Sequence, residues 1–404
     1  MVMFKLVPVL ILSIFFYSVD AQYKYDNVLY KTVYAQDLHT QLKLNPGYLF
    51  LDVRSKGEFS DTSNMTGMNL GHLKNAKNIN VNELGTKINQ LNEFKNKPVF
   101  VYCSHSQRSR RTCKMLADSG FTNLFNINGG MTTFLQTPGS IHDLYKTTNK
   151  YLILSPAEFC NEVNNNNPFI LDLRSDSSFK NNSTSITLNA LGNIRNAHNI
   201  PYEKLKYSLD VLPRDKSIIL IDEFGDQSAD AAMFLISEGF TKISILFDGL
   251  LNFVNTNSAD LNCKNLVWIH DTKFQLISVE ELDELRNHDP GLTILDVRNK
   301  DEFENRSKTR WRNIGHVKNA INIPADQIPS NIHQILSSKD APFVIYSFSS
   351  DSPGYNAASA LANKGFTKVY LLSGGLFNIR WRANNIKGKS SLKDLVTDVP
   401  EENL

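Results

Sequence analysis

Short runs of consecutive apolar residues recur along the chain, each followed by a polar loop and then by a stretch with helical spacing of its apolar positions. Such runs occupy residues 98–102, 218–221 and 343–346. Short apolar runs bounded by polar loops are typical of strands that are buried on both faces of a parallel sheet. Their alternation with helices predicts an α/β fold, with a central parallel sheet and helices on both of its faces.

The whole pattern occurs three times. Phe50-Leu51-Asp52-Val53-Arg54 returns as ILDLR at residues 170–174 and as ILDVR at residues 294–298, so that the aspartates are separated by 120 and 124 residues. Later in each copy come a Gly-x-x-(Lys/Arg)-Asn-Ala-x-Asn-Ile segment, a Gly-Phe pair, and a closing Gly-Gly or Asp-Gly pair. This period is too long for a solenoid repeat and fits a small domain. We therefore expect three tandem domains, at residues 28–140, 150–260 and 274–386.

The segments between and after these domains are polar. Residues 138–150 and 255–273 lack helical periodicity, and residues 387–404 are rich in Lys, Ser and Glu. We expect the first two to be connections and the last to be a flexible tail.

The first 21 residues have the pattern of a secretory signal. Lys5 precedes an apolar run from Leu6 to Val19, and Ala21 is a small residue before the predicted cleavage point at Gln22. The alternative is an uncleaved anchor, but the run is shorter than the roughly 18 to 20 residues of a spanning helix. We expect no stable membrane span after cleavage and a location outside the cell, in the periplasm or in the secretory lumen.

Composition narrows the function classes. The 404 residues are 41% hydrophobic and 21% charged, which is ordinary globular usage. A net charge of +2 gives no sign of nucleic-acid binding. Four cysteines are too few for a disulfide-built scaffold, and none has zinc-site spacing. We expect no metal site, and any cysteine chemistry must depend on single residues.

One polar loop carries candidate chemistry. In the first copy, Cys103 follows the apolar run and precedes a predicted helix. Backbone N–H groups and a helix N-terminus at this place favour thiolate over thiol. Arg108, with Arg110 and Arg111 beside it, predicts a pocket that attracts a small anion. The alternative from the residues alone is that Cys103 only completes the strand as a buried, inert side chain.

These motifs together resemble the rhodanese (thiosulfate sulfurtransferase) family, in three copies that cover nearly all of the chain. The resemblance implies that Cys103 is the catalytic nucleophile and carries sulfane sulfur as a persulfide. It also implies a loop whose residues bind the substrate, with Arg108 orienting the anion or bracing the loop: Ser104, His105, Ser106, Gln107, Arg108 and Ser109. Related phosphatases resemble Cys-x5-Arg, whereas this loop is Cys-x4-Arg, which favours sulfur over phosphate chemistry. No cofactor is implied.

The sequence departs from the family pattern in each copy. Ser106 stands where the family usually has glycine, which matters if that position has a positive φ. In the second copy Asp222 takes the cysteine position and Gln227 that of the arginine. In the third, Ser347 takes the cysteine position in a loop one residue longer. We expect the second and third domains to be inactive.

The remaining cysteines and the repeated Asp-x-Arg pairs have structural interpretations. Cys113 is expected on the helix after the loop, with its side chain packed in the hydrophobic core of the domain. Cys160 and Cys263 lie near the two ends of the second domain, where they either form a disulfide or stay apart. Asp52 and Arg54, like their counterparts, are expected to brace loops through hydrogen bonds.

Four glycosylation sequons lie in one equivalent loop of the three copies, between the Asp-x-Arg strand and the glycine segment. If the source is eukaryotic, this shared place makes glycosylation an expectation at Asn64, Asn181, Asn182 and Asn305.

The leading hypothesis is a three-domain sulfurtransferase that moves sulfane sulfur through Cys103. Its expected partners are a small sulfur anion such as thiosulfate and a thiol or cyanide acceptor. The first alternative is a non-catalytic rhodanese-like binding or scaffold protein of the secretory or extracellular space. A phosphatase or arsenate reductase of the same fold is a third hypothesis, against which the loop length argues.

Overall fold

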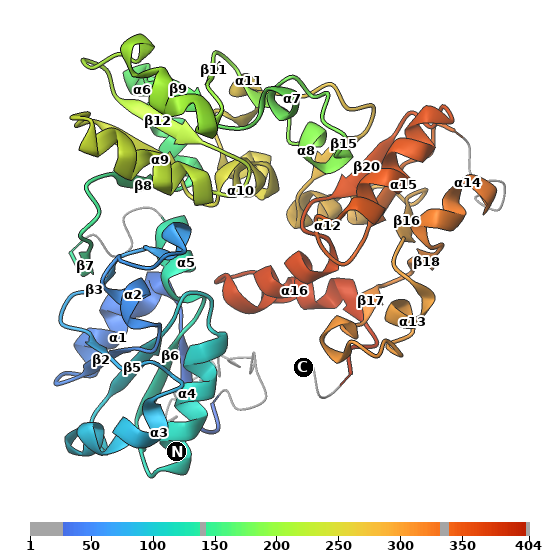
Figure 1. The fold of residues 1–404 in the computed structure, drawn as a ribbon. Helices are drawn as coiled ribbons and strands as arrows, with labels where there is room; N and C mark the ends of the chain where they lie inside the picture. The colour runs from blue at the N-terminus through green and yellow to red at the C-terminus, as the bar shows by residue number, and fades with distance from the viewer. Residues whose placement is uncertain (1–26, 138–142, 332–338, 401–404) are drawn as a thin grey trace, which may run out of the picture.

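The computed structural model describes residues 27–137, 143–331 and 339–400, which form three α/β domains (Figure 1). The predicted signal at residues 1–21 lies outside the described residues. Within the described part of the chain, no helix is both long enough and apolar enough to cross a membrane.

The first domain is built on a five-stranded parallel sheet in the order β1-β6-β5-β2-β4. Its strands are β1 (Lys31–Val33), β2 (Leu49–Asp52), β4 (Lys77–Asn78), β5 (Val99–Tyr102) and β6 (Leu124–Ile127). Its helices are α1 (Leu38–Leu44), α2 (Lys56–Phe59), α3 (Leu84–Lys87), α4 (Gln107–Asp118) and α5 (Gly130–Gln136), with 3-10 turns η1 (Ala35–Asp37), η2 (Thr66–Met68) and η3 (Ile88–Phe94).

The second domain repeats this sheet in the order β11-β9-β12-β13-β8. Its strands are β8 (Leu152–Leu154), β9 (Phe169–Asp172), β11 (His198–Asn199), β12 (Ile218–Ile221) and β13 (Ile243–Leu246). Its helices and turns are α6 (Pro156–Asn166), α7 (Asp176–Phe179), α8 (Ile186–Ala190), α9 (Asp226–Ser237), α10 (Gly249–Asn255), α11 (Lys264–Val267), η4 (Tyr202–Tyr207), η5 (Leu209–Val211) and η6 (Ser258–Asp260).

The third domain has the same sheet again, in the order β15-β20-β19-β16-β18. Its strands are β15 (Gln275–Ile277), β16 (Thr293–Asp296), β18 (Ile321–Asn322), β19 (Phe343–Tyr346) and β20 (Val369–Leu372). Its helices and turns are α12 (Val279–His288), α13 (Lys300–Phe303), α14 (Ile328–Asn331), α15 (Ser352–Asn363), α16 (Gly375–Asn385), η7 (Arg310–Arg312), η8 (Ala325–Gln327) and η10 (Ser390–Leu395). The predicted fold class is confirmed in all three copies.

Each sheet is buried on both faces, which explains the uninterrupted apolar runs. In β5, Val99 and Val101 belong to one core cluster, while Phe100 and Tyr102 belong to another. Successive side chains of a strand point to opposite faces, so both faces need apolar residues when helices cover both.

The predicted Asp-x-Arg braces are present. Arg54 makes charge-assisted hydrogen bonds to Asp52 and also donates from Nη2 to the carbonyl oxygen of Gly71 at 2.6 Å, with both side chains fully buried. Arg298 reaches Gly315 in the same way in the third domain, at 2.9 Å. The pair ties the end of β2, or of β16 in the third domain, to the start of the glycine segment, so its role is structural.

The expectations for the connections and the tail were partly wrong. After the last helix of each domain, the chain adds a short antiparallel strand to the glycine segment: β7 (Tyr145–Lys146) on β3 (His72–Leu73), β14 (Trp268–Ile269) on β10 (Asn193–Ile194), and β21 (Val396–Thr397) on β17 (His316–Val317). Leu392 and Leu395 are buried, so the predicted flexible tail is docked at least as far as residue 397. Only isolated apolar residues such as Leu392 and Leu395 anchor these segments, and isolated apolar residues form no periodic pattern in the sequence.

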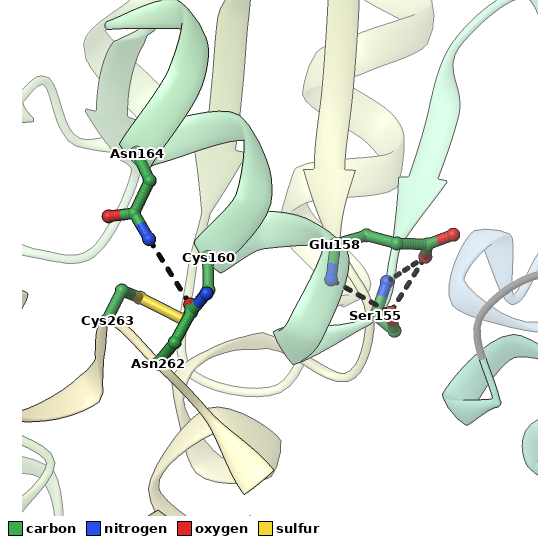
Figure 2. The surroundings of a disulfide bond; sticks show 6 residues. All are labelled: Ser155, Glu158, Cys160, Asn164, Asn262 and Cys263. Carbon is green, nitrogen blue, oxygen red and sulfur yellow. Dashed lines mark hydrogen bonds between the residues drawn. A yellow bond between two sulfur atoms is a disulfide. The ribbon is translucent and has the colours of Figure 1, made fainter.

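Cys160 and Cys263 form a disulfide, with their Cα atoms 5.2 Å apart (Figure 2). It joins α6 to the residue that caps α11, and a hydrogen bond from Asn164 to Asn262 lies beside it. The bond closes a loop that spans the second domain from its first helix to its last.

The four sequons are not equivalent in the structure. Asn64 and Asn182 are exposed, whereas Asn181 and Asn305 are half-buried turn residues with φ of +55° and +56°. The amide of Asn305 donates to the carbonyl of Asp398 at 2.6 Å and accepts from the N–H of Gly315 at 2.9 Å. Glycosylation therefore stays a prediction for Asn64 and Asn182 and is disfavoured at Asn305.

Candidate functional site

Cys103 stands directly after β5, at the carboxyl edge of the first sheet. Its carbonyl oxygen accepts from the N–H of Met131 at 2.9 Å, which joins the loop to the start of α5. A Cβ atom at Gly130 would overlap that carbonyl oxygen, and Gly130 also has a φ of +55°. The closing glycine is therefore required by the close approach of α5 to the cysteine loop.

The sulfur of Cys103 lies inside the loop, where Ser106 and Ser109 lie against it and Arg108 also interacts with Cys103. The backbone N–H of Ser106 donates to Sγ at 3.1 Å, and the hydroxyl of Ser109 lies 3.7 Å from Sγ. Cys103 is only 1% exposed. A backbone N–H donor therefore points at the sulfur from within the loop.

The backbone of Ser106 has a positive φ, the conformation for which the family usually has glycine at this position. Its φ is +83°, and Gly225 has a φ of +92° at the equivalent place in the second domain. The Ser106 hydroxyl donates to Oδ1 of Asn128 at 3.1 Å and accepts from the N–H of Gly129. These two hydrogen bonds compensate for the strain of a non-glycine residue in the left-handed region.

Changing Ser106 to alanine is expected to destabilise the first domain by about 1 to 3 kcal/mol, because the strain stays while a buried hydrogen-bonding network loses its centre. Ser106→Gly loses the same bonds but relieves the strain, so its loss should be smaller. Thermal unfolding of the two variants checks this order. A Ser106→Gly variant that is less stable than Ser106→Ala would contradict it.

Arg108 braces the loop. Its guanidinium group makes two hydrogen bonds to the carboxylate of Glu58, at 2.8 and 2.7 Å, and a third to Oγ of Ser104 at 2.9 Å. Burial alone raises the pKa of Glu58, but the hydrogen bonds from Arg108 and Ser55 outweigh it and bring the pKa from 4.5 to about 2. Of the two roles that the family resemblance implies, bracing is the one this geometry favours, and the positive charge available to an anion is smaller than predicted.

This ion pair predicts a pH-dependent stability. The pKa of Glu58 is lower in the folded chain than in the unfolded chain, so its contribution is complete above about pH 5 and is lost as the pH falls toward 2. The difference in unfolding free energy between wild type and Glu58→Gln should reach about 3 kcal/mol near neutrality and shrink below pH 4. Thermal unfolding of both proteins from pH 7 to pH 2.5 measures it, and a constant difference would contradict the assignment.

Asn126 is a site residue that sequence reasoning missed. It lies in β6, fully buried, and its Oδ1 accepts from the hydroxyl of Ser109 at 2.6 Å. The residues three positions before the closing pair in the other copies are Ile245 and Leu371, which are apolar and buried. The sequence did contain a signal for Asn126: a polar residue stands at this strand position only in the copy that has the cysteine. Burying a polar group costs free energy, so such a residue is expected to have a role.

The other predicted loop residues face outward or support the loop. His105 and Gln107 are exposed, and the ring of His105 contacts Oγ of Ser104 at 2.8 Å. Ser104 and Ser109 are buried, with their hydroxyls bound to Arg108 and Asn126. No cluster of His, Cys, Asp or Glu that could hold a metal ion occurs among the described residues.

In the second domain, the loop already contains an anion. The carboxylate of Asp222 accepts from the N–H groups of Gly225, Gln227 and Ser228 at 2.5, 2.6 and 3.1 Å. Burial raises the pKa of Asp222, and these backbone bonds oppose that rise. The backbone donors that would hold a substrate in this loop are therefore already bound to a carboxylate of the protein, which agrees with the expectation that the second domain is inactive.

In the third domain, Ser347 is buried, and its carbonyl oxygen accepts from the N–H of Leu376 at 3.0 Å. The hydroxyl of Ser350 accepts from the N–H of Gly374 at 2.8 Å, as Ser106 does from Gly129 in the first domain. The frame of the loop is kept here, but the cysteine and the arginine are absent.

Comparison with known proteins bears on the family of the three domains. The sequence model of the rhodanese-like domain family matches residues 35–137, 155–256 and 278–380. The uncharacterized protein YqhL of Bacillus subtilis is 29% identical over 131 residues, which are 32% of this chain and 90% of that protein. The tRNA uridine(34) hydroxylase of Hamiltonella defensa is 26% identical over 107 residues, 26% of this chain and only 27% of that protein.

Among solved structures, a thiosulfate sulfurtransferase from Pseudomonas aeruginosa is 16% identical and aligns over 84% of this chain and 66% of its own length, with a TM-score of 0.24. A rhodanese-related protein from Thermoplasma volcanium is 24% identical and aligns over 26% of this chain and 91% of its own, with a TM-score of 0.22. The three matched segments cover most of the sequence and coincide with the three parallel sheets. The chain therefore belongs to the rhodanese-like domain family and contains three such domains in tandem.

Proposed function

We propose that the first domain is a sulfurtransferase that carries sulfane sulfur on Cys103. The observation that carries this proposal is the contact between Sγ of Cys103 and the N–H of Ser106, in a loop held rigid by Arg108 and Glu58. A preorganised N–H donor at the reacting atom stabilises charge without reorganisation during the reaction.

In the first step, the Cys103 thiolate attacks the outer sulfur of thiosulfate. A Cys103 Sγ–S bond forms, the S–S bond of thiosulfate breaks, and its electron pair leaves with sulfite. In the second step, an acceptor attacks the outer sulfur of the persulfide, and the electron pair of the Cys103 Sγ–S bond returns to Sγ. No external oxidant or reductant is needed.

The loops of the second and third domains carry no sulfur themselves. Asp222 and Ser347 cannot form a persulfide, and the donors of the second loop are bound to Asp222. We further propose that the chain is exported by its first 21 residues, and the disulfide between Cys160 and Cys263 supports an oxidising compartment.

The direct test is the formation of thiocyanate from thiosulfate and cyanide by the purified chain, with hydrolysis of p-nitrophenyl phosphate measured in parallel. Thiocyanate formation without phosphate release is the expected result. Phosphate release without thiocyanate would support the phosphatase hypothesis instead, and neither reaction would favour a binding protein.

A further inference from the structure

A cavity of about 780 Å³ lies between the three domains, and its wall includes equivalent residues of each. His105, Phe224 and Ser349 all line it, and each stands two residues after the cysteine position of its own copy. The loop that carries Cys103 and the two inactive loops therefore face the same space.

A second set of equivalent residues continues the wall. Thr132, Leu251 and Phe377 each lie two residues after the closing glycine, on α5, α10 and α16. These three helices gather around the middle of the molecule (Figure 1). The cavity thus borders all three rhodanese-like loops, and in the first of them the lining residue His105 is two residues from the buried Cys103.

The three domains contribute different chemistry. The first gives polar side chains, including Thr132 and Gln136, whereas the two inactive copies give all of the aromatic side chains of the wall except the ring of His105, together with polar and charged ones. Phe224 is 53% exposed and Phe377 is 52% exposed. Exposed aromatic surface inside a cavity is a favourable place for an apolar group of a ligand.

The wall is fixed against the active loop by direct contacts. Asn128, which holds the hydroxyl of Ser106, donates from Nδ2 to the carbonyl of Asn384 at the end of α16, at 2.6 Å. Lys387 makes an ion pair with Asp37 at 2.5 Å. The third domain is therefore hydrogen-bonded to Asn128, which in turn holds Ser106 of the Cys103 loop.

The size of the cavity bears on the ligand. Cavities of about 300 to 1,000 Å³ are typical of sites for organic molecules. A site for thiosulfate or cyanide alone needs neither this volume nor the aromatic wall, and the proposed loading step already provides for the anion in the loop.

We propose that this cavity binds the sulfur acceptor, and that the acceptor is an organic thiol with an apolar or aromatic body. The proposal rests on the proposed sulfurtransferase function. The thiolate of the acceptor attacks the outer sulfur of the Cys103 persulfide, an S–S bond forms within the new acceptor persulfide, and the electron pair of the broken bond stays on Sγ of Cys103.

The test is the discharge of preloaded Cys103 persulfide by benzyl mercaptan or by cyanide. Phe224→Ala and Phe377→Ala are each expected to raise the KM for benzyl mercaptan about tenfold, since each removes aromatic contact area, and to leave discharge by cyanide unchanged. Tyr207→Ala is the matched control, because Tyr207 is a 77% exposed aromatic residue of the second domain that is not among the cavity-lining residues. Equal KM values in all four proteins would overturn the proposal.

A binding measurement separates this inference from the proposed function. Benzyl methyl sulfide has the same body but cannot accept sulfur, so its affinity for a Cys103→Ser chain is measured by calorimetry. Binding that Phe377→Ala weakens about tenfold supports the cavity, and binding that Phe377→Ala does not change overturns it. If thiosulfate fails to load the wild-type chain, the sulfurtransferase function fails whatever this affinity is.

Discussion

Replacement of Cys103 by serine is expected to reduce thiosulfate-dependent sulfur transfer by at least about a thousandfold, because a hydroxyl oxygen cannot carry a persulfide. The rate of thiocyanate formation measures the loss. The fold should be preserved, since serine is similar in size and Ser347 occupies the same buried position in the third domain.

Cys113→Ala is the matched control for this substitution. Cys113 is the other free cysteine of the described chain and is fully buried. Burial raises the pKa of its thiol, which keeps it protonated and unreactive. Full activity in Cys113→Ala and none in Cys103→Ser is expected, while equal loss in the two variants would mean that the chemistry had been assigned to the wrong sulfur.

Removing the disulfide should have the largest effect on stability. The bond between Cys160 and Cys263 closes a loop with a sequence separation of 103 residues. In the chain-entropy account, cross-linking a loop of this length stabilises the folded state by about 5 kcal/mol. The double variant Cys160→Ala with Cys263→Ala should therefore unfold its second domain at a lower temperature in scanning calorimetry.

Reductant provides the control for this prediction. It should lower the unfolding temperature of the wild-type chain and leave that of the double variant unchanged, because no other disulfide occurs in the described residues. A wild-type chain whose unfolding is insensitive to full reduction would contradict the entropic role given to the bond.

The fold was predictable because the same motifs recur in the same order in three copies. Strands buried on both faces need consecutive apolar residues, and the Asp-x-Arg pair needs both of its members in every copy. The position of Cys103 at a strand end followed from the same pattern. Bracing of a loop by Asp52 and Arg54 was also expected, but the sequence did not indicate that Gly71 is the partner of Arg54.

The partners that complete the site were not predictable from spacing. Glu58 lies 50 residues before Arg108, and nothing in the sequence indicates which carboxylate the guanidinium group meets. The cavity depends on how three domains are arranged, and that arrangement depends on single contacts such as the one between Asn128 and Asn384. Asn126 could have been noticed, because its strand position is apolar in the other copies.

The central claim is that Cys103 takes up sulfane sulfur, and intact-mass analysis of the purified chain with and without thiosulfate tests it most directly. The wild-type chain should gain the mass of one sulfur atom and lose it again on addition of cyanide, while Cys103→Ser should gain nothing. A folded wild-type chain with a free Cys103 that gains no sulfur from thiosulfate or from a second sulfane donor would contradict the claim, and the protein would then be a rhodanese-like binding module.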